Sequence, residues 1–146
     1  TDISNHYHFR KGNTMVLKHS KQRDSIKEFL MGRKDHPTAA VVYDNVRRSF
    51  PNISLGTVYR NLTLLADIGE ISRIHVGDGV DHFDADTSPH YHFICSECGC
   101  VRDLDMPGID LDEIASRNFD GQIECHTVYF HGRCRDCCQR FHSVNT

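Results

Sequence analysis

Two C-x-x-C pairs near the carboxyl end constrain this chain more than any other feature of its sequence. They are Cys95-Ser-Glu-Cys98 and Cys134-Arg-Asp-Cys137. Each pair can bend around one metal ion, and four thiolates in a tetrahedron are typical of structural zinc. Gly99 follows the first pair and can adopt the positive φ that such a tight turn needs. A redox C-x-x-C needs only one pair, so we predict one structural Zn²⁺ site made of all four cysteines.

The remaining cysteines fit the same interpretation. All seven cysteines lie between Cys95 and Cys138, and a disulfide framework would use an even number spread along the chain. Cys100, Cys125 and Cys138 are expected to be buried or incidental thiols, with Cys138 as an alternative ligand or a partner in disulfide exchange. No apolar run approaches the roughly 20 residues that cross a bilayer, and residues 1–18 are polar. We therefore expect a soluble, cytoplasmic chain without a membrane segment.

Charge divides the sequence into two halves. The formal net charge of −3 would not favour a nucleic-acid partner by itself. Residues 1–83, however, hold 12 Lys/Arg against 9 Asp/Glu, a difference of +3, and residues 84–146 hold 5 against 11, a difference of −6. Only the first half has the sign that suits a phosphate backbone.

Helical periodicity and capping residues organise the first half. Ser20, Thr38 and Ser54 are each placed to cap a helix. The first has apolar Ile26, Phe29 and Leu30 and stops at Gly32; the second has Val42, Val46 and Phe50 and ends at Pro51; the third has Leu55, Val58, Leu62 and Leu65 inward and ends at Gly69. Residues 71–76 and 80–83 then form β-like runs around Gly77-Asp78-Gly79. Three helices and a hairpin make a winged helix-turn-helix.

The second half changes in character. We place a hinge at residues 84–89, strands at 91–95, 101–104 and 123–131, and a helix at 109–117. The expected fold class is α+β, with a winged helix-turn-helix domain over residues 1–84 and a small α/β domain with structural zinc over residues 85–146.

A second group of metal-binding residue types is scattered over both halves. His90 and His92 flank Tyr91, so their imidazoles point the same way on a strand, and Asp103 lies on the next predicted strand. Asp84 ends the hairpin and His36 opens the second helix. Nitrogen and oxygen donors of this kind suit a divalent transition metal. The alternative is a solvated acidic and histidine-rich surface.

Four segments together resemble the ferric-uptake-regulator (Fur) superfamily from about Ser20 to Cys138. They are His36-Pro-Thr-Ala, the run from Phe50 to Leu62 (FPNISLGTVYRNL), the run from His90 to Gly99 (HYHFICSECG), and Gly132-Arg-Cys-Arg-Asp-Cys. The resemblance implies a metal-dependent dimeric transcriptional repressor, with DNA binding in the first half, dimerisation in the second and structural zinc on the paired cysteines. It implies no enzymatic activity.

The resemblance is strongest to the peroxide-sensing (PerR) branch. His36, Asp84, His90, His92 and Asp103 match the positions of that branch's ligands for a regulatory Fe²⁺ or Mn²⁺ ion. The resemblance implies that iron-bound peroxide would oxidise His36 or His90. Iron sensors usually have glutamate in place of Asp103, but Arg60 is typical of iron regulators. An iron-responsive or other metal-responsive repressor therefore remains the alternative.

The resemblance also implies a palindromic, AT-rich double-stranded operator bound by a homodimer. We expect Arg60 to contact guanine, with Tyr59 and Thr57 near thymine methyls or phosphate, and Arg23, Arg47 and Arg48 as candidates for backbone phosphate. Asp110 and His126 fall at two positions of a further family metal site, where Tyr91 replaces an acidic ligand. No role is predicted for His6 and His8. A zinc hydrolase lacks its motifs here, and a zinc-stabilised interaction module without DNA binding is a weaker alternative.

Overall fold

The computed structural model describes residues 18–77, 79–106 and 108–144, and these form two compact units. One unit ends at Thr87 and the other begins at Ser88. The His6–His8 arm lies outside the described residues. None of the helices in this part of the chain has the length and hydropathy of a membrane span.

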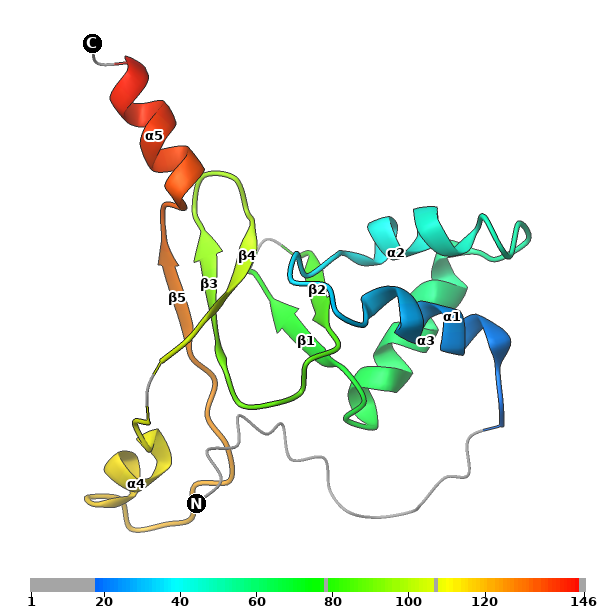
Figure 1. Ribbon diagram of the computed structural model, residues 1–146. Coiled ribbons are helices and arrows are strands. Elements are labelled where there is room, and N and C mark those ends of the chain that lie inside the picture. The colour runs from blue at the N-terminus through cyan, green and yellow to red at the C-terminus, as the bar shows by residue number, and fades with distance from the viewer. Residues whose placement is uncertain (1–17, 78, 107, 145–146) are drawn as a thin grey trace. The chain divides into compact units, whose positions relative to one another are not determined.

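The first unit has the element order of a winged helix-turn-helix, as predicted (Figure 1). Its helices are α1 (Lys21–Leu30), α2 (Ala39–Val46) and α3 (Leu55–Asp67), and its antiparallel hairpin pairs β1 (Ser72–His75) with β2 (Asp81–Asp84). One apolar core joins them. Its fully buried members come from every helix and from β2, and include Ile26, Val42, Leu62 and Phe83.

Local capping explains where these helices begin. The hydroxyl oxygens of Ser20, Thr38 and Ser54 each accept a hydrogen bond from the backbone N–H group three residues later in the chain. The distances are 3.4, 3.5 and 3.1 Å. Gly32 and Gly69 lie beyond the ends of α1 and α3 with φ of +73° and +77°. The three predicted caps and the stops at Gly32 and Gly69 are confirmed.

Two details of the predicted helices are wrong. The second helix ends at Val46 rather than continuing to Pro51, because the chain tightens into turns in which Ser49 and Phe50 both donate their N–H to the Val46 carbonyl. Leu55 was predicted to face inward but is 41% exposed. It occupies the first turn of α3, and side chains tilt toward the amino end of a helix, so Leu55 projects past the core.

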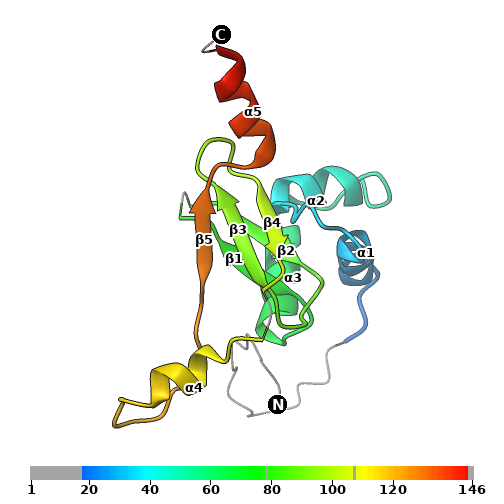
Figure 2. The same ribbon diagram turned by 60° about the vertical axis from the view of Figure 1, so that its left-hand side comes forward.

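The second unit is a three-stranded sheet with two helices (Figure 2). The central strand β3 (Tyr91–Cys95) is antiparallel to β4 (Val101–Leu104) and parallel to β5 (Tyr129–Gly132). Helix α4 (Leu111–Ser116) lies in the connection from β4 to β5, and α5 (Arg135–Val144) follows β5. The predicted α/β character of this half, and the α+β class of the whole chain, are confirmed.

Here too the elements differ from prediction. The strand expected over 123–131 is limited to Tyr129–Gly132, because its ladder partner β3 pairs with it only from His92 to Cys95. The helix expected over 109–117 covers Leu111–Ser116, with Asp110 as its cap. Helix α5 was not predicted at all.

Candidate metal centres and the exposed face of α3

Five thiols gather where β3 and β5 end and β4 begins. The sulfur atoms of Cys95, Cys98, Cys100 and Cys134 all lie within 4.8 Å of one another. Parallel pairing of β3 with β5 sets Cys95 opposite Gly132, and the Ser96 N–H donates to the Gly132 carbonyl at 2.7 Å. This pairing brings the first C-x-x-C beside the second.

Three of the four predicted zinc ligands belong to the close group of sulfur atoms, and the fourth packs beside it. Cys95, Cys98 and Cys134 belong to the close group, and Cys137, in the first turn of α5, is 4% exposed and packs with Cys95 and Cys134. Gly99 has the positive φ, +69°, that the turn was expected to need. A set of four or more converging thiols fits Zn²⁺ by donor chemistry. Sequence reasoning had left Cys100 out of this set.

Backbone N–H groups favour the thiolate form of two of these cysteines. The Cys134 N–H donates to Cys95 Sγ at 3.3 Å and is the main reason why the pKa of Cys95 falls to about 6. The N–H of Cys137 likewise lowers the pKa of Cys134. Burial acts in the opposite direction on the other two thiols, raising the pKa of Cys100 to about 11 and that of Cys137 to about 12. Metal binding requires thiolates, so a bound cation would have to offset this burial.

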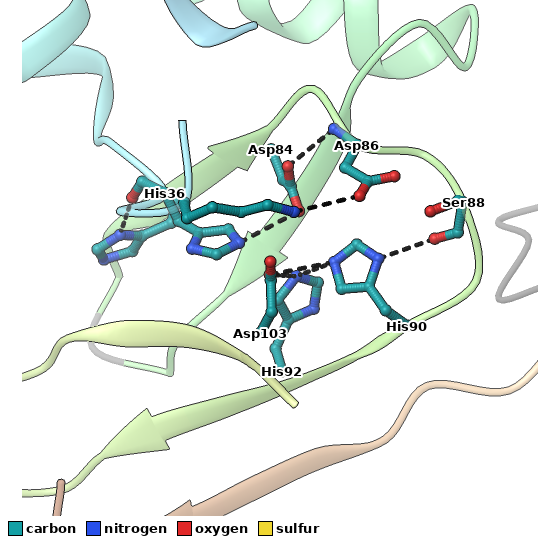
Figure 3. A network of polar contacts seen from close by, with 9 residues as sticks. His36, Asp84, Asp86, Ser88, His90, His92 and Asp103 are labelled. Atoms are coloured by element: carbon teal, nitrogen blue, oxygen red, sulfur yellow. Dashed lines mark hydrogen bonds and ion pairs between the residues drawn. The ribbon is translucent and has the colours of Figure 1, made fainter. Parts of the chain in front are cut away.

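Two histidines and an aspartate converge on the β3–β4 pair. His92 lies directly opposite Asp103, and its Nε2 is 3.8 Å from Asp103 Oδ1. His90 precedes β3 on the same side, with its Nε2 3.0 Å from His92 Nε2 and 3.3 Å from Asp103 Oδ1. His90 Nδ1 lies 2.8 Å from the Ser88 carbonyl, to which it donates (Figure 3). That hydrogen bond leaves a lone pair on Nε2, as in imidazoles that bind metals.

The first unit contributes a buried histidine and aspartate. His36 Nε2 is 3.2 Å from Asp84 Oδ2, and both side chains are almost completely buried (Figure 3). Asp84 Oδ1 accepts a hydrogen bond from the Asp86 N–H at 2.8 Å. His82 Nδ1 donates to the His36 carbonyl at 2.6 Å, and the Phe83 N–H donates to the Pro37 carbonyl, so β2 holds the His36 segment beside Asp84.

His36 also has an unusual backbone conformation. Its φ is +47°, and among the described residues it is the one non-glycine residue with positive φ. The ring of Pro37 disfavours the helical conformation for the residue before it, and a non-glycine residue in the left-handed region is strained. Strain of this kind is often retained at functional sites. Imidazole and carboxylate donors, such as those found in each unit, suit a divalent transition metal such as Fe²⁺ or Mn²⁺.

The further pair flagged in the sequence is arranged differently from expectation. Asp110 accepts the Glu113 N–H as the cap of α4, at 2.8 Å. His126 Nδ1 instead lies 2.7 Å from Asp112 Oδ1. The ring of Tyr91 stacks beside that of His126, with centroids 6.4 Å apart. Asp112, rather than Asp110, is therefore the acidic partner of His126.

The polar face of α3 is exposed, as the sequence suggested. Tyr59 is 41% exposed, and Arg60 is also exposed. Arg60 Nη2 donates to Thr57 Oγ1 at 3.1 Å, and Thr57 Oγ1 lies 2.9 Å from Ser54 Oγ. The capping hydroxyl of α3 thus connects through Thr57 to the guanidinium that we predict reads the operator.

The candidate phosphate contacts lie on α1 and after α2. The Arg23 guanidinium donates to the Lys18 carbonyl. Arg47 lies 3.3 Å from Asp44 and over the Tyr43 ring, and Arg48 is exposed. These contacts within the chain do not test whether the three arginines bind DNA, so that role stays a prediction.

A winged helix-turn-helix joined to a unit with clustered thiols and imidazoles defines a metal-responsive DNA-binding regulator. The sequence model of the ferric uptake regulator family matches residues 14–131. The chain is 38% identical over 117 residues to the peroxide-responsive repressor PerR of Staphylococcus saprophyticus, covering 80% of this chain and 79% of the relative.

Solved structures agree. The ferric uptake regulator Fur of Vibrio cholerae superposes with a TM-score of 0.66 and 31% identity, covering 81% of this chain and 92% of that one. The peroxide stress regulator of Campylobacter jejuni has a TM-score of 0.68 and 27% identity, covering 80% and 88%. The chain belongs to the ferric uptake regulator family, whose members are metal-responsive transcriptional repressors rather than enzymes.

Proposed function

We propose that this chain is a homodimeric repressor that binds a palindromic, AT-rich operator through the exposed face of α3. The exposure of Tyr59 and Arg60 and the excess of positive charge before residue 84 support this proposal. Each protomer would insert one α3 into the major groove of a half-site, so the spacing of half-sites would follow from the dimer. The acidic second half would carry the dimer contacts.

We propose two metals with different tasks. Zn²⁺ on the cysteine cluster would tie β3 to the start of α5 and thus stabilise a unit whose core is small. Fe²⁺ or Mn²⁺ would take His36 and Asp84 from the first unit and His90, His92 and Asp103 from the second. Binding of one ion by donors from both units would restrict their relative orientation to the one that fits two half-sites.

Within this function we propose peroxide sensing, and the observation that carries it is Asp103. This short carboxylate lies opposite His92 on β4, at the position where iron sensors usually have glutamate. The staphylococcal relative is itself named a peroxide-responsive repressor.

Bound Fe²⁺ would supply the electron that cleaves the O–O bond of hydrogen peroxide. The protein's own part is to hold an imidazole carbon of His36 or His90 beside that reaction. In net terms one peroxide oxygen enters an imidazole C–H bond and the other leaves as water. The oxidised ring would be a poorer ligand, so the protein would hold the ion less tightly and release the operator.

Operator binding measured without oxygen tests the proposal. The Fe²⁺-loaded protein should bind operator DNA, and added peroxide should release it and add one oxygen atom to a peptide containing His36 or His90. The Mn²⁺-loaded protein is the matched control and should keep both its DNA and its unmodified histidines. Loss of DNA binding in both metal forms would point to oxidation of thiols instead.

The alternative function is iron-responsive repression without peroxide sensing, and Arg60 is the residue that favours it. Under that function the Fe²⁺ protein would keep its operator under peroxide and release it only when iron is removed by a chelator. The same binding assay therefore distinguishes the two functions.

A further inference from the structure

Cys100 is the fifth thiol of a cluster in which zinc needs four. Ile94 pairs with Val101 across β3 and β4, and the Cys95 N–H donates to the Cys100 carbonyl at 2.9 Å. Cys95 and Cys100 are thus the next opposed pair along this hairpin. Side chains of opposed residues share one face of a sheet, with Cβ atoms about 4.5–5.5 Å apart. Strand pairing therefore directs the Cys100 thiol to the same side as Cys95.

The distances among the sulfur atoms confirm this placement. Cys100 Sγ lies within 4.8 Å of each of the sulfur atoms of Cys95, Cys98 and Cys134. Cys137 packs against the same core from α5. Two sets of four thiols consequently share three members and differ only in whether Cys100 or Cys137 is the fourth.

An arginine accompanies each of the two competing thiols. Arg140 Nη2 donates to Cys137 Sγ at 3.0 Å. Arg102, on β4, hydrogen-bonds the Cys100 sulfur, and its Nη2 lies 3.4 Å from Asp136 Oδ2. A sulfur that is not bound to metal thus keeps a charged hydrogen-bond donor in either state, which lowers the cost of leaving it without the ion.

We propose that Cys100 is a reserve ligand that exchanges with Cys137 for the fourth position on the zinc ion. This inference rests on the proposed zinc site. Cys95, Cys98 and Cys134 stay bound while the Zn–S bond to Cys137 breaks and the bond to Cys100 forms, and the proton of the Cys100 thiol passes to the departing Cys137 sulfur. No oxidation is involved. The site tolerates the loss of either exchanging thiol, which is useful in a protein exposed to peroxide.

A double-mutant cycle tests the exchange. Cys100→Ser and Cys137→Ser should each retain zinc and, after substitution with Co²⁺, the strong sulfur-to-metal absorption of a four-thiolate site. The double variant should lose that absorption. Its zinc affinity is measured by chelator competition. The loss of affinity in the double variant should exceed the combined losses of the two single variants by roughly tenfold or more. Cys138→Ser is the matched control, because Cys138 Sγ faces the Arg133 carbonyl and lies outside the close group.

The inference is overturned if Cys137→Ser loses the four-thiolate absorption as completely as the double variant does. It is equally overturned if Cys100→Ser alone abolishes the absorption while Cys137→Ser has no effect, because Cys100 would then be a permanent ligand. Absence of zinc from the wild-type protein would contradict the zinc site itself. Zinc in the wild type but not in Cys137→Ser would contradict only the exchange.

Alkylation of the wild-type protein gives a second test that needs no variant to fold. Zinc-loaded chains treated with a thiol reagent should accept one label at either Cys100 or Cys137 and still carry zinc in native mass spectrometry. Chains labelled at both should have lost it. Zinc loss after a single label at Cys137 would refute the exchange.

Discussion

Replacing Asp103 with glutamate tests the proposed sensing chemistry with the smallest change that the site allows. Asp103→Glu keeps the charge and the oxygen donor but extends the side chain by one C–C bond, about 1.5 Å. Asp103 Oδ1 is 3.3 Å from His90 Nε2 and 3.8 Å from His92 Nε2. The added length is about two fifths of these separations, so the longer carboxylate could turn both oxygens toward an ion held by these imidazoles.

A carboxylate that offered both oxygens to a bound ion would compete with peroxide for that ion. Mutations of the residues that orient metal ligands typically cost about 10- to 100-fold in metal affinity or activity, and we take that range as the scale for this small change in a ligand. We therefore expect histidine oxidation in the Fe²⁺ variant to slow by that factor, about 1.4 to 2.7 kcal/mol in activation free energy. Operator binding with Mn²⁺ should stay within a few-fold of the wild type, because the donor set is unchanged.

The assay is a peroxide time course of the Fe²⁺ protein, read by operator binding and by the oxygen gained on peptides containing His36 and His90. Asp105→Glu is the matched control, since Asp105 is an exposed aspartate just beyond β4. If Asp103→Glu oxidises at the wild-type rate while binding DNA normally, the length of this carboxylate does not control the reaction. Unmodified histidines in the wild type under the same conditions would favour the iron-responsive function.

Three further predictions concern other parts of the molecule. Arg60→Ala should weaken binding to the cognate operator by about 1–3 kcal/mol and binding to random DNA much less, whereas Arg48→Ala should affect both sequences equally; gel shifts on both sequences would reveal equal losses for Arg60 if it contacts only phosphate. Cys95→Ser removes a thiol common to both possible zinc sets, so zinc and the dimer should be lost together while Cys125→Ser retains them; a stable, zinc-loaded Cys95→Ser dimer in ultracentrifugation would contradict the zinc site. Leu62→Ala truncates a fully buried side chain of α3 and should lower the free energy of unfolding by about 2–5 kcal/mol in denaturant titration, and a loss below 1 kcal/mol would mean that the core around α3 is not packed as described.

Much of the first unit follows from local sequence. Ser20, Thr38 and Ser54 cap their helices because a side-chain oxygen three residues before an N–H needs no distant partner. Glycine at Gly69 ends α3 for an equally local reason, its tolerance of positive φ. The end of α2, by contrast, depends on tertiary packing. Its apolar spacing continues to Phe50, but the chain turns after Val46 to pack Phe50 against the shared core.

The second unit depends more on long-range pairing. Helix α5 was missed because its sequence, RDCCQRFHSV, was interpreted through its cysteines and has little apolar content. Its helical spacing of Cys137, Cys138 and Phe141 was the available signal. Strand β5 pairs in parallel with β3, although the two segments lie far apart in the sequence. No short turn connects them, so the local sequence does not determine the register of this pair.

The same division applies to the candidate metal ligands. Alternation along a strand was enough to predict that His90 and His92 point the same way, and the C-x-x-C spacing was enough to predict a thiol cluster. Which thiols stand closest was decided by the β3–β4 hairpin, which sets Cys100 beside Cys95, and by β5, which delivers Cys134. Residue type and short-range periodicity determine what a side chain can bind, because both are properties of the local chain. Which side chains meet depends on strand register, which arises only when distant segments pair and pack.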